Sequence, residues 1–404
     1  MEMNPILDKL PRHLMNLVID QPYNSYTAQD HAIWRYVMRQ NVRYLKRVAH
    51  HSYIDGLAKT GISIDQIPHM YGMNRILKEI GWAAVAVDGF IPPAAFMEFQ
   101  AYKVLVIAAD IRTINQIEYT PAPDIIHEAA GHAPIIADPE YAEYLRYFGE
   151  VGSKAFSSAH NYRIYEAIRH LSILKADPYS SMDEITQAEF DLAELEKDAD
   201  QDSEMSQMRN LHWWTVEYGL IGDLENPKIY GAGLLSSIGE SYSSLQPAVK
   251  KLPYTVEAAN QNFDITTRQP QLFVTPNFDH LIDVLDLFTC NLALRRGGLY
   301  GVKKAIESEN TATVQYNSGL QVSGTFTNVN SVGGDVVYIR TTGPTALAFS
   351  NKQLEGHGKK YHVHGFGSPV GTVNGLSKPL FTMSNEELRS AGIELNKPTE
   401  LSFD

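Results

Sequence analysis

Apolar residues recur at steps of three to five positions through the first fifth of the chain, which is the spacing of helices that bury one face. Thr27 begins this pattern and is followed three positions later by an acid, a combination typical of a helix N-terminus. Similar patterns occur further along. The helices that we expect lie within 27–80, over 138–147, as an amphipathic pair within 153–206, and over 280–294.

Short apolar runs predict strands between these helices. Residues 85–96 form a strand-like run that turns at Gly89, and residues 103–109 are apolar enough for a buried strand. In the last hundred residues the pattern changes to alternation, first over 311–326 around a turn at Asn317-Ser318-Gly319. We therefore expect a mainly α region with a few short strands, followed by a small β-rich C-terminal region.

Composition narrows the class of protein. The 404 residues carry a formal net charge of −13 and are 44% hydrophobic, which is normal for a globular protein with a sizeable core. The acidic balance argues against nucleic acid or an anionic membrane as a partner. The single cysteine, Cys290, fits a reducing compartment, and no stretch approaches the ~18 apolar residues of a membrane span. We expect a cytoplasmic protein; its oligomeric state is left open.

The densest chemistry lies in Tyr119 to His132, where His127 and His132 flank Glu128 after a rigid Pro-x-Pro-Asp segment. Neutral imidazole is a common ligand of zinc, copper, iron and nickel. The two imidazoles are five residues apart, roughly 140° around an ideal helix, so they would splay unless the helix ends or bends. Gly131 gives the backbone freedom to do so. The alternative is a pair of structural histidines.

A third ligand is offered by Glu217, a lone acid in the aromatic and β-branched run from His212 to Gly219. A buried carboxylate is costly unless it is paired or binds a metal, although a glutamate on the exposed face of a core helix would explain the same pattern. Two histidines and one carboxylate, with positions left open, form the ligand set of non-haem Fe(II) oxygenases.

Three motifs in one order resemble the pterin-dependent aromatic amino acid hydroxylases. They are Thr120 to His132, Trp213 to Gly219, and Tyr230 to Ser237 with the Gly239-Glu240 pair. The resemblance covers about residues 26–301. It implies the catalytic fold of that family for 26–301, preceded by an arm at 1–25. Residues 302–404 have no counterpart and form an appendage whose role is not indicated.

The resemblance also implies the reaction. Fe(II) is expected on His127, His132 and Glu217, with one face open to O2 and a free aromatic amino acid. Tetrahydrobiopterin or a related tetrahydropterin supplies two electrons. One oxygen atom ends on the substrate ring and the other on the pterin. The protein contributes orientation and exclusion of water.

Further residues match the cofactor and substrate positions of the family. Gly89, Ile91, Phe96 and Glu128 are expected around the pterin. Pro123, His127 and Trp213 are expected around the substrate ring, and Arg112, Thr120, Asp124 and Ser236 at its amino acid end. Arginine suits this last role because its planar fork matches a carboxylate. A core aromatic at Phe96 and a surface arginine at Arg112 are the structural alternatives.

The chain also departs from the family pattern. His212 stands where animal members have tyrosine, and Val106, Ala108 and Asp110 replace polar and aromatic residues. These departures leave the identity of the substrate open, and phenylalanine is favoured over tryptophan or tyrosine. Two other functions compete: a zinc hydrolase with Glu128 as general base, and a non-catalytic relative that binds an aromatic ligand. The five-residue spacing counts against the hydrolase, since zinc helices of that kind use a spacing of four.

Overall fold

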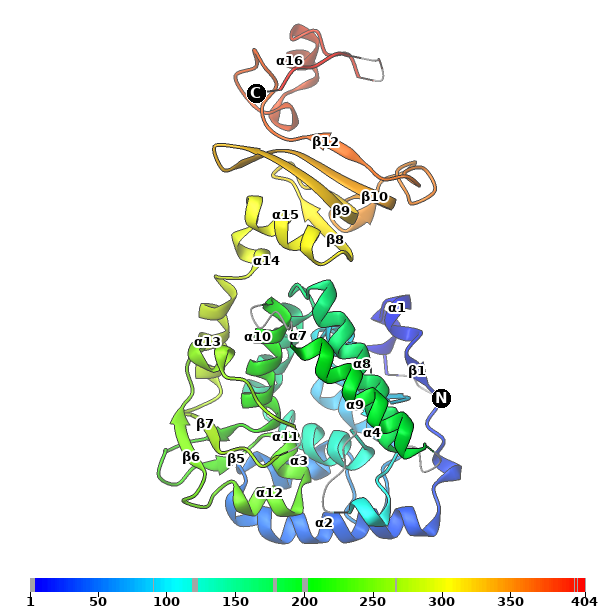
Figure 1. Cartoon of the computed structure of the whole chain (residues 1–404), viewed down its shortest axis with the longest axis vertical. Coiled ribbons are helices and arrows are strands. Elements are labelled where there is room, and N and C mark those ends of the chain that lie inside the picture. Colours follow the sequence, from blue (N-terminus) through cyan, green and yellow to red (C-terminus); the bar gives the residue numbers. More distant parts are fainter. Residues whose placement is uncertain are drawn as a thin grey trace. The chain divides into compact units, whose positions relative to one another are not determined.

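The computed structural model describes residues 4–89, 91–117, 123–176, 180–197, 203–265, 267–395, 397 and 399–403. The chain divides into two compact units. The first comprises Met1–Ala155 and His160–Cys290, and the second comprises Phe156–Ala159 and Asn291–Asp404. Each unit has its own core (Figure 1).

The first unit begins with short turns and then three helices. Thr27 caps the long helix α2 by accepting from the backbone of Asp30, whose carboxylate accepts from Thr27 in return, so the predicted helix start is confirmed. Leu10 and Leu14 are buried against the β2 and β3 strands. The elements here are η1 (Leu7–Lys9), α1 (Arg12–Met15), β1 (Val18–Ile19), η2 (Tyr23–Ser25), α2 (Ala28–Val48), α3 (Ser52–Lys59), α4 (Met70–Leu77) and η3 (Lys78–Ile80).

A parallel strand pair, β2 (Ala83–Val87) and β3 (Val104–Ala108), is joined by helix α5 (Pro93–Ala101). Both strands are buried along their whole length, as a parallel pair covered on two faces requires. The strand predicted over 85–96 is wrong in its second half. Pro93 stands in the first turn of α5, where its missing N–H is harmless, and therefore starts a helix that carries Phe96.

The remainder of the first unit is mostly helical and surrounds the site described below. A small sheet in the order β5-β4-β7-β6 packs beside it. The elements are η4 (Ile114–Gln116), η5 (Ile126–His132), α6 (Ala133–Ile135), α7 (Pro139–Gly152), α8 (Ala159–Ala176), α9 (Met182–Glu196), α10 (Glu204–His212), η6 (Trp213–Glu217), β4 (Leu220–Ile221), β5 (Lys228–Ile229), α11 (Ala232–Ser236), α12 (Ile238–Ser243), β6 (Lys250–Pro253), η7 (Val256–Asn260), β7 (Gln271–Thr275) and α13 (Asp279–Thr289).

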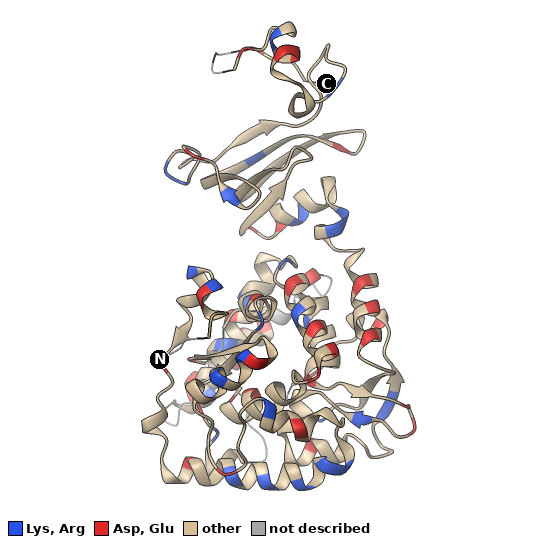
Figure 2. Ribbon diagram, turned by 180° about the vertical axis from the view of Figure 1, so that it is seen from behind, with Lys and Arg blue, Asp and Glu red and all other residues tan. Residues whose placement is uncertain are grey.

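The second unit is built on a curled antiparallel sheet in the order β11-β10-β9-β8, with β12 also paired to β10. The predicted hairpin turn at Asn317-Ser318-Gly319 joins β8 to β9. Val322, Phe326 and Ile339 pack with residues of α15 into its core. Figure 2 shows few charged residues along these strands. The elements are α14 (Ala293–Arg296), α15 (Gly298–Glu307), β8 (Thr311–Gln315), β9 (Leu320–Val332), β10 (Asp335–Phe349), β11 (Lys352–Gln353), β12 (Gly367–Pro369), η8 (Leu380–Thr382) and α16 (Asn385–Ser390).

None of the helices in the described part of the chain combines the length and the apolar character needed to cross a bilayer.

Candidate active site

Two π-helical segments position the expected metal ligands. Residues Ile126–His132 form the π-helix η5, in which backbone bonds run from residue i to i+5. Residues five apart therefore return almost to the same face, so His127 and His132 point to the same side. We expected the helix to end or bend between them; it widens instead. Glu217 lies at the end of a second π-helical segment, η6.

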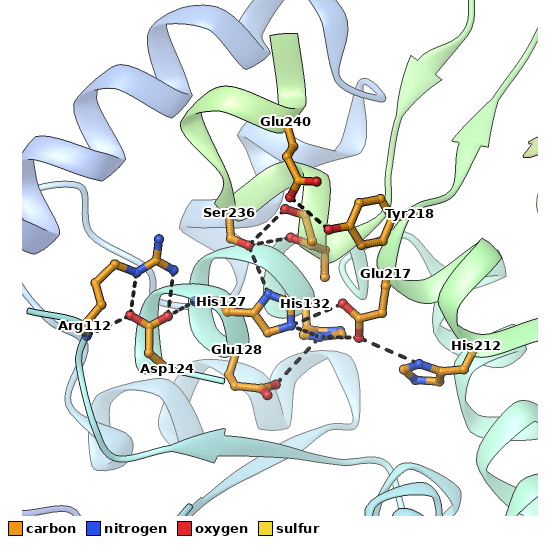
Figure 3. Close-up of polar contacts among 12 residues, drawn as sticks. Arg112, Asp124, His127, Glu128, His132, His212, Glu217, Tyr218, Ser236 and Glu240 are labelled. Atoms are coloured by element: carbon orange, nitrogen blue, oxygen red, sulfur yellow. Dashed lines mark hydrogen bonds and ion pairs between the residues drawn. The ribbon is translucent and has the colours of Figure 1, made fainter. Parts of the chain in front are cut away.

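The three expected donors converge on one point (Figure 3). Nε2 of His127 is 3.2 Å from Oε2 of Glu217, and Nε2 of His132 is 3.3 Å from Oε1 of Glu217. The two Nε2 atoms are 3.2 Å apart. The two imidazoles and the carboxylate thus form the corners of a donor triangle in which each imidazole faces a different oxygen of Glu217. Glu217 is nevertheless 85 residues from His132 along the chain.

This triangle fits a bound transition-metal ion. Donors about 2.1 Å from an ion and separated by roughly 90–110° lie about 3.0–3.4 Å from one another. The separation of the two Nε2 atoms falls within that range, and so does the distance from each Nε2 to its nearer Glu217 oxygen. Two imidazoles and one carboxylate also form the donor set that suits Fe(II) with open positions. The residues present therefore fit the metal that the sequence predicts.

A second carboxylate, that of Glu128, lies close to the same imidazoles. Its Oε2 is 3.7 Å from Nε2 of His132, farther than either contact of Glu217. Burial raises the pKa of Glu128, and the imidazoles offset this only in part. Burial would also raise the pKa of Glu217, but His132 and His127 hold it well below its usual value. Of the two carboxylates, Glu217 is therefore the one that the imidazoles stabilise in its charged form.

The hydroxyl of Ser236 orients the His127 ring. It donates a hydrogen bond to the carbonyl of Ala232 at 2.8 Å, so its oxygen can accept from Nδ1–H of His127 at 3.0 Å. This arrangement leaves the lone pair of Nε2 facing the donor triangle. Burial lowers the pKa of His127, but the Glu217 carboxylate opposes this and raises it to about 9. A cation at the triangle would therefore displace a proton.

Arg112 and Asp124 form a buried two-point ion pair next to the site. Nε and Nη2 of Arg112 each lie 2.8 Å from a different oxygen of Asp124. The carboxylate also accepts from the backbone N–H of Arg112 and of His127. A surface location for Arg112 is therefore excluded, because only 6% of it is exposed. Thr120, expected at the same end of the substrate, lies outside the described residues.

Trp213 lines the cavity as part of a stack of three aromatic rings. Its ring stacks on Phe263 at a centroid distance of 4.3 Å and on Tyr218 at 4.5 Å. Its Nε1 is buried and has no hydrogen-bond partner among the described residues. An indole N–H in that state is available to a ligand, since buried donors are almost always paired.

The residues expected around the cofactor and substrate line one cavity of about 360 Å³, within the range of small-ligand sites. His132 and Asp124 are absent from its walls and lie behind them, next to lining residues. The predicted residues that line it are Gly89, Ile91, Phe96, Arg112, Pro123, His127, Glu128, Trp213, Glu217 and Ser236.

The model of the biopterin-dependent aromatic amino acid hydroxylases matches residues 19–160 and 152–300, about 70% of the chain. The chain belongs to this family. It is 28% identical to phenylalanine-4-hydroxylase of Chromobacterium violaceum over 271 residues, covering 66% of this chain and 76% of the relative. It is 27% identical to phenylalanine-4-hydroxylase of Mesorhizobium japonicum over 276 residues, covering 66% and 82%.

Solved structures of the family share this fold. The Chromobacterium violaceum phenylalanine hydroxylase with bound iron(III) and 7,8-dihydrobiopterin aligns with a TM-score of 0.54 and 26% identity. The alignment covers 69% of this chain and 86% of that structure. The hydroxylase fold expected from the three motifs is confirmed.

Helix α8 forms part of the cavity wall, which the sequence of this hydroxylase did not predict. The amphipathic helix pair within 153–206 is present as predicted, but its pattern indicated no contact with the cavity. Tyr165, Ile168 and Arg169 of α8 line the cavity together with Arg209 of α10. The acidic composition of the helix pair predicted a solvated surface, because only a few residues on one face of α8 point into the cavity.

Replacing Tyr165 by phenylalanine should raise the KM for one organic ligand of the hydroxylase by about 2- to 10-fold, the worth of one hydrogen bond. The buried Tyr165 hydroxyl has no partner among the described residues and borders the cavity. Removing it should leave the melting temperature unchanged or higher. The control is Tyr162→Phe, on the same helix but 45% exposed. Unchanged KM values for both amino acid and pterin in Tyr165→Phe would refute a ligand contact.

Gly131 allows α11 to approach the ligand-bearing π-helix. A Cβ at this position would lie 2.6 Å from the backbone oxygen of Ala232. Its φ lies outside the left-handed region, so the close approach of α11 is the reason that the structure gives for a glycine here. The same approach brings the Ser236 hydroxyl of α11, which donates to the Ala232 carbonyl of its own helix, within reach of His127.

Gly131→Ala should therefore destabilise the hydroxylase by about 1–3 kcal/mol, the usual result of overpacking. It should also weaken metal binding, because His132 is the next residue. Gly72→Ala is the matched control: it lies within helix α4, and nothing is within 4 Å of its added Cβ. That variant should be neutral or up to about 1 kcal/mol more stable. Equal unfolding midpoints for the two variants would contradict the role of close approach.

Proposed function

We propose that this protein is an Fe(II)- and tetrahydropterin-dependent monooxygenase that hydroxylates the ring of a free aromatic amino acid, with phenylalanine converted to tyrosine. The observation that carries the proposal is the convergence of His127, His132 and Glu217 at the wall of an aromatic-lined cavity. Membership of the hydroxylase family and the names of its relatives support the same reaction.

His127, His132 and Glu217 would hold the iron, leaving its open side toward the cavity. Bound iron and reduced pterin would together supply the chemistry of O2 activation: two electrons come from the pterin, one oxygen atom goes to the ring and one to the pterin. The protein's own contribution is geometric. Ser236 fixes the His127 ring, and the two π-helical segments hold the donors together before a ligand arrives.

The substrate ring would lie against Trp213 and Pro123, both in the cavity wall. The stack of Trp213 between Tyr218 and Phe263 keeps its indole in one orientation, which favours a single pose of a flat ring. At the amino acid end, Asp124 occupies Nε and Nη2 of Arg112 and holds the guanidinium in a fixed plane. A substrate carboxylate would meet the other edge of the guanidinium, at Nη1.

The pterin would lie near the turn between β2 and α5. Gly89 adopts φ +61°, a left-handed conformation that suits glycine, and turns the chain after β2. Ile91 and Phe96 follow it in the cavity wall, and Glu128 approaches from η5. These four residues supply an apolar face and one carboxyl group, which is the chemistry needed by a flat heterocycle with polar edges.

The remaining expectations about organisation stay proposals. They are an arm at 1–25, a catalytic region at 26–301 and an appendage at 302–404. The family match runs from residue 19 to residue 300, which supports the boundary before the appendage. The cytoplasmic location and the absence of nucleic-acid partners rest on composition alone.

The decisive experiment supplies purified protein with Fe(II), O2, tetrahydrobiopterin and each aromatic amino acid in turn, and identifies products by mass. We expect tyrosine from phenylalanine, with one oxygen atom of labelled O2 in the product. Zn(II) in place of Fe(II) should support no hydroxylation. Absence of any hydroxylated amino acid, with iron shown to be bound, would exclude the proposed reaction and favour a non-catalytic ligand-binding protein.

A further inference from the structure

His212 immediately precedes the π-helical segment that carries Glu217, and its imidazole faces that carboxylate. Nδ1 of His212 is 3.7 Å from Oε1 of Glu217. In Figure 3 the Glu217 carboxylate lies between His212 on one side and the His127 and His132 rings on the other. His212 therefore approaches the metal site from behind Glu217, where it can act on the ligand without itself binding the ion.

We propose that His212 is a positioning residue for Glu217: its Nδ1–H donates a hydrogen bond to Oε1 and thereby reserves Oε2 for the metal. The inference rests on the proposed function only in requiring that Glu217 bind iron. His212 is a position at which this chain departs from the animal members of its family. Its Nδ1 atom has a defined partner, Oε1 of Glu217.

The contacts of Glu217 divide its two oxygens. Oε2 faces His127 at 3.2 Å, whereas Oε1 faces His132 at 3.3 Å and His212 at 3.7 Å. Once an ion binds to Oε2 and to both Nε2 atoms, those two imidazoles no longer have a proton to give Oε1. A buried carboxylate oxygen needs a donor, and in the described part of the chain Nδ1 of His212 is the remaining one.

The separation of 3.7 Å is longer than a hydrogen bond, so the bond has to form as the carboxylate turns. The last torsion of a glutamate side chain is a broad sp³–sp² rotation and permits this at little cost. Rotation that brings Oε2 toward the donor triangle carries Oε1 away from it, toward His212. The same rotation of the Glu217 carboxylate thus brings Oε2 to the metal and Oε1 to His212.

Packing holds the His212 ring so that Nδ1 faces the Glu217 carboxylate. Phe96 and Phe148 pack against it at centroid distances of 5.8 and 5.4 Å with steep interplanar angles. Its Nε2 is buried without a hydrogen-bond partner among the described residues. A bare acceptor is better tolerated there than an unpaired N–H, which favours the tautomer with hydrogen on Nδ1, toward the carboxylate.

Packing alone would make a different prediction. If His212 only filled space between Phe96 and Phe148, phenylalanine at this position would serve equally well. The test therefore compares three variants: His212→Phe keeps the packing and removes the donor, His212→Asn keeps an N–H near the position of Nδ1, and His212→Gln places its N–H farther out, near the position of Nε2.

Fe(II) and Co(II) dissociation constants are measured by competition with a chelator, and the Co(II) complexes are compared by visible absorption. We expect His212→Phe and His212→Gln to bind either ion roughly 10- to 100-fold more weakly, as lost partners of metal ligands usually do. His212→Asn should lie within about 3-fold of the wild type and retain its Co(II) spectrum. Thermal unfolding without added metal checks that all three variants fold.

Wild-type affinity and spectrum in His212→Phe would overturn the inference. Equal weakening in His212→Phe and His212→Asn would overturn it too, since the loss would then follow the ring and not the donor. These outcomes are distinct from failure of the proposed function, which appears as wild-type protein that binds neither ion or that binds Fe(II) and hydroxylates nothing.

Discussion

Replacing Glu217 by glutamine is expected to lower the rate of hydroxylation by roughly a thousandfold, corresponding to about 4 kcal/mol of lost stabilisation at the metal. The substitution keeps the shape of the side chain but removes the negative charge that faces both His127 and His132. Fe(II) affinity should fall as well, and partial recovery of activity at millimolar Fe(II) would fit weakened binding.

The control for this variant is Glu257→Gln, which removes an exposed carboxylate from the same unit. Product formation is measured over a range of Fe(II) concentrations for both proteins. Glu257→Gln should behave as the wild type. Wild-type turnover in Glu217→Gln would remove the third ligand, and the comparison would then have to be repeated with Glu128→Gln, whose carboxylate is the next nearest to His132.

Asp124→Asn is expected to destabilise the first unit by about 3–5 kcal/mol, because it leaves the buried Arg112 guanidinium without a charged partner. Both residues are almost inaccessible, with side-chain exposures of 4% and 3%. Burial would raise the pKa of Asp124, but Arg112 and the backbone donors hold it below its usual value, so the carboxylate is ionised at neutral pH. Asp124 also accepts a hydrogen bond from the backbone N–H of His127, so loss of its charge should displace His127.

Urea unfolding followed by tryptophan fluorescence measures the stability of the first unit, which contains Asp124. All four tryptophans, at positions 34, 82, 213 and 214, lie within that unit. The matched control is Asp65→Asn, which breaks the Arg39–Asp65 pair, where both side chains are 64% exposed. An exposed pair contributes about 1 kcal/mol or less. Similar shifts for both variants would show that the Arg112–Asp124 pair does not depend on burial.

Local sequence was sufficient where the deciding interactions are local. The cap formed by Thr27 and Asp30 spans four residues, and the turn at Asn317-Ser318-Gly319 is set by its own backbone preferences. Phe96 shows the limit of this reasoning. An apolar run suits a buried strand or a buried helix, and Pro93 starts a helix where the run over 85–96 predicts a strand.

The candidate site shows the same difference between what local sequence indicates and what contacts between elements decide. Residue types and motif order indicated which side chains take part, and the cavity includes most of them. Three features depended on tertiary structure. The π-helical path of His127 to His132 is stabilised by packing against α11, α8 lines the cavity through a few inward side chains, and His212 gains its partner only when Glu217 is in place.

The sequence by itself determined the family, the metal-binding residue types and the helical or alternating character of most segments, because these depend on side-chain chemistry and on periodicity along the chain. Only the tertiary structure decided that His127, His132 and Glu217 meet within about 3.3 Å of one another and that an acidic helix pair reaches the cavity. The reason is that burial, close backbone approach and the pairing of distant groups arise from contacts between elements, which no local pattern encodes.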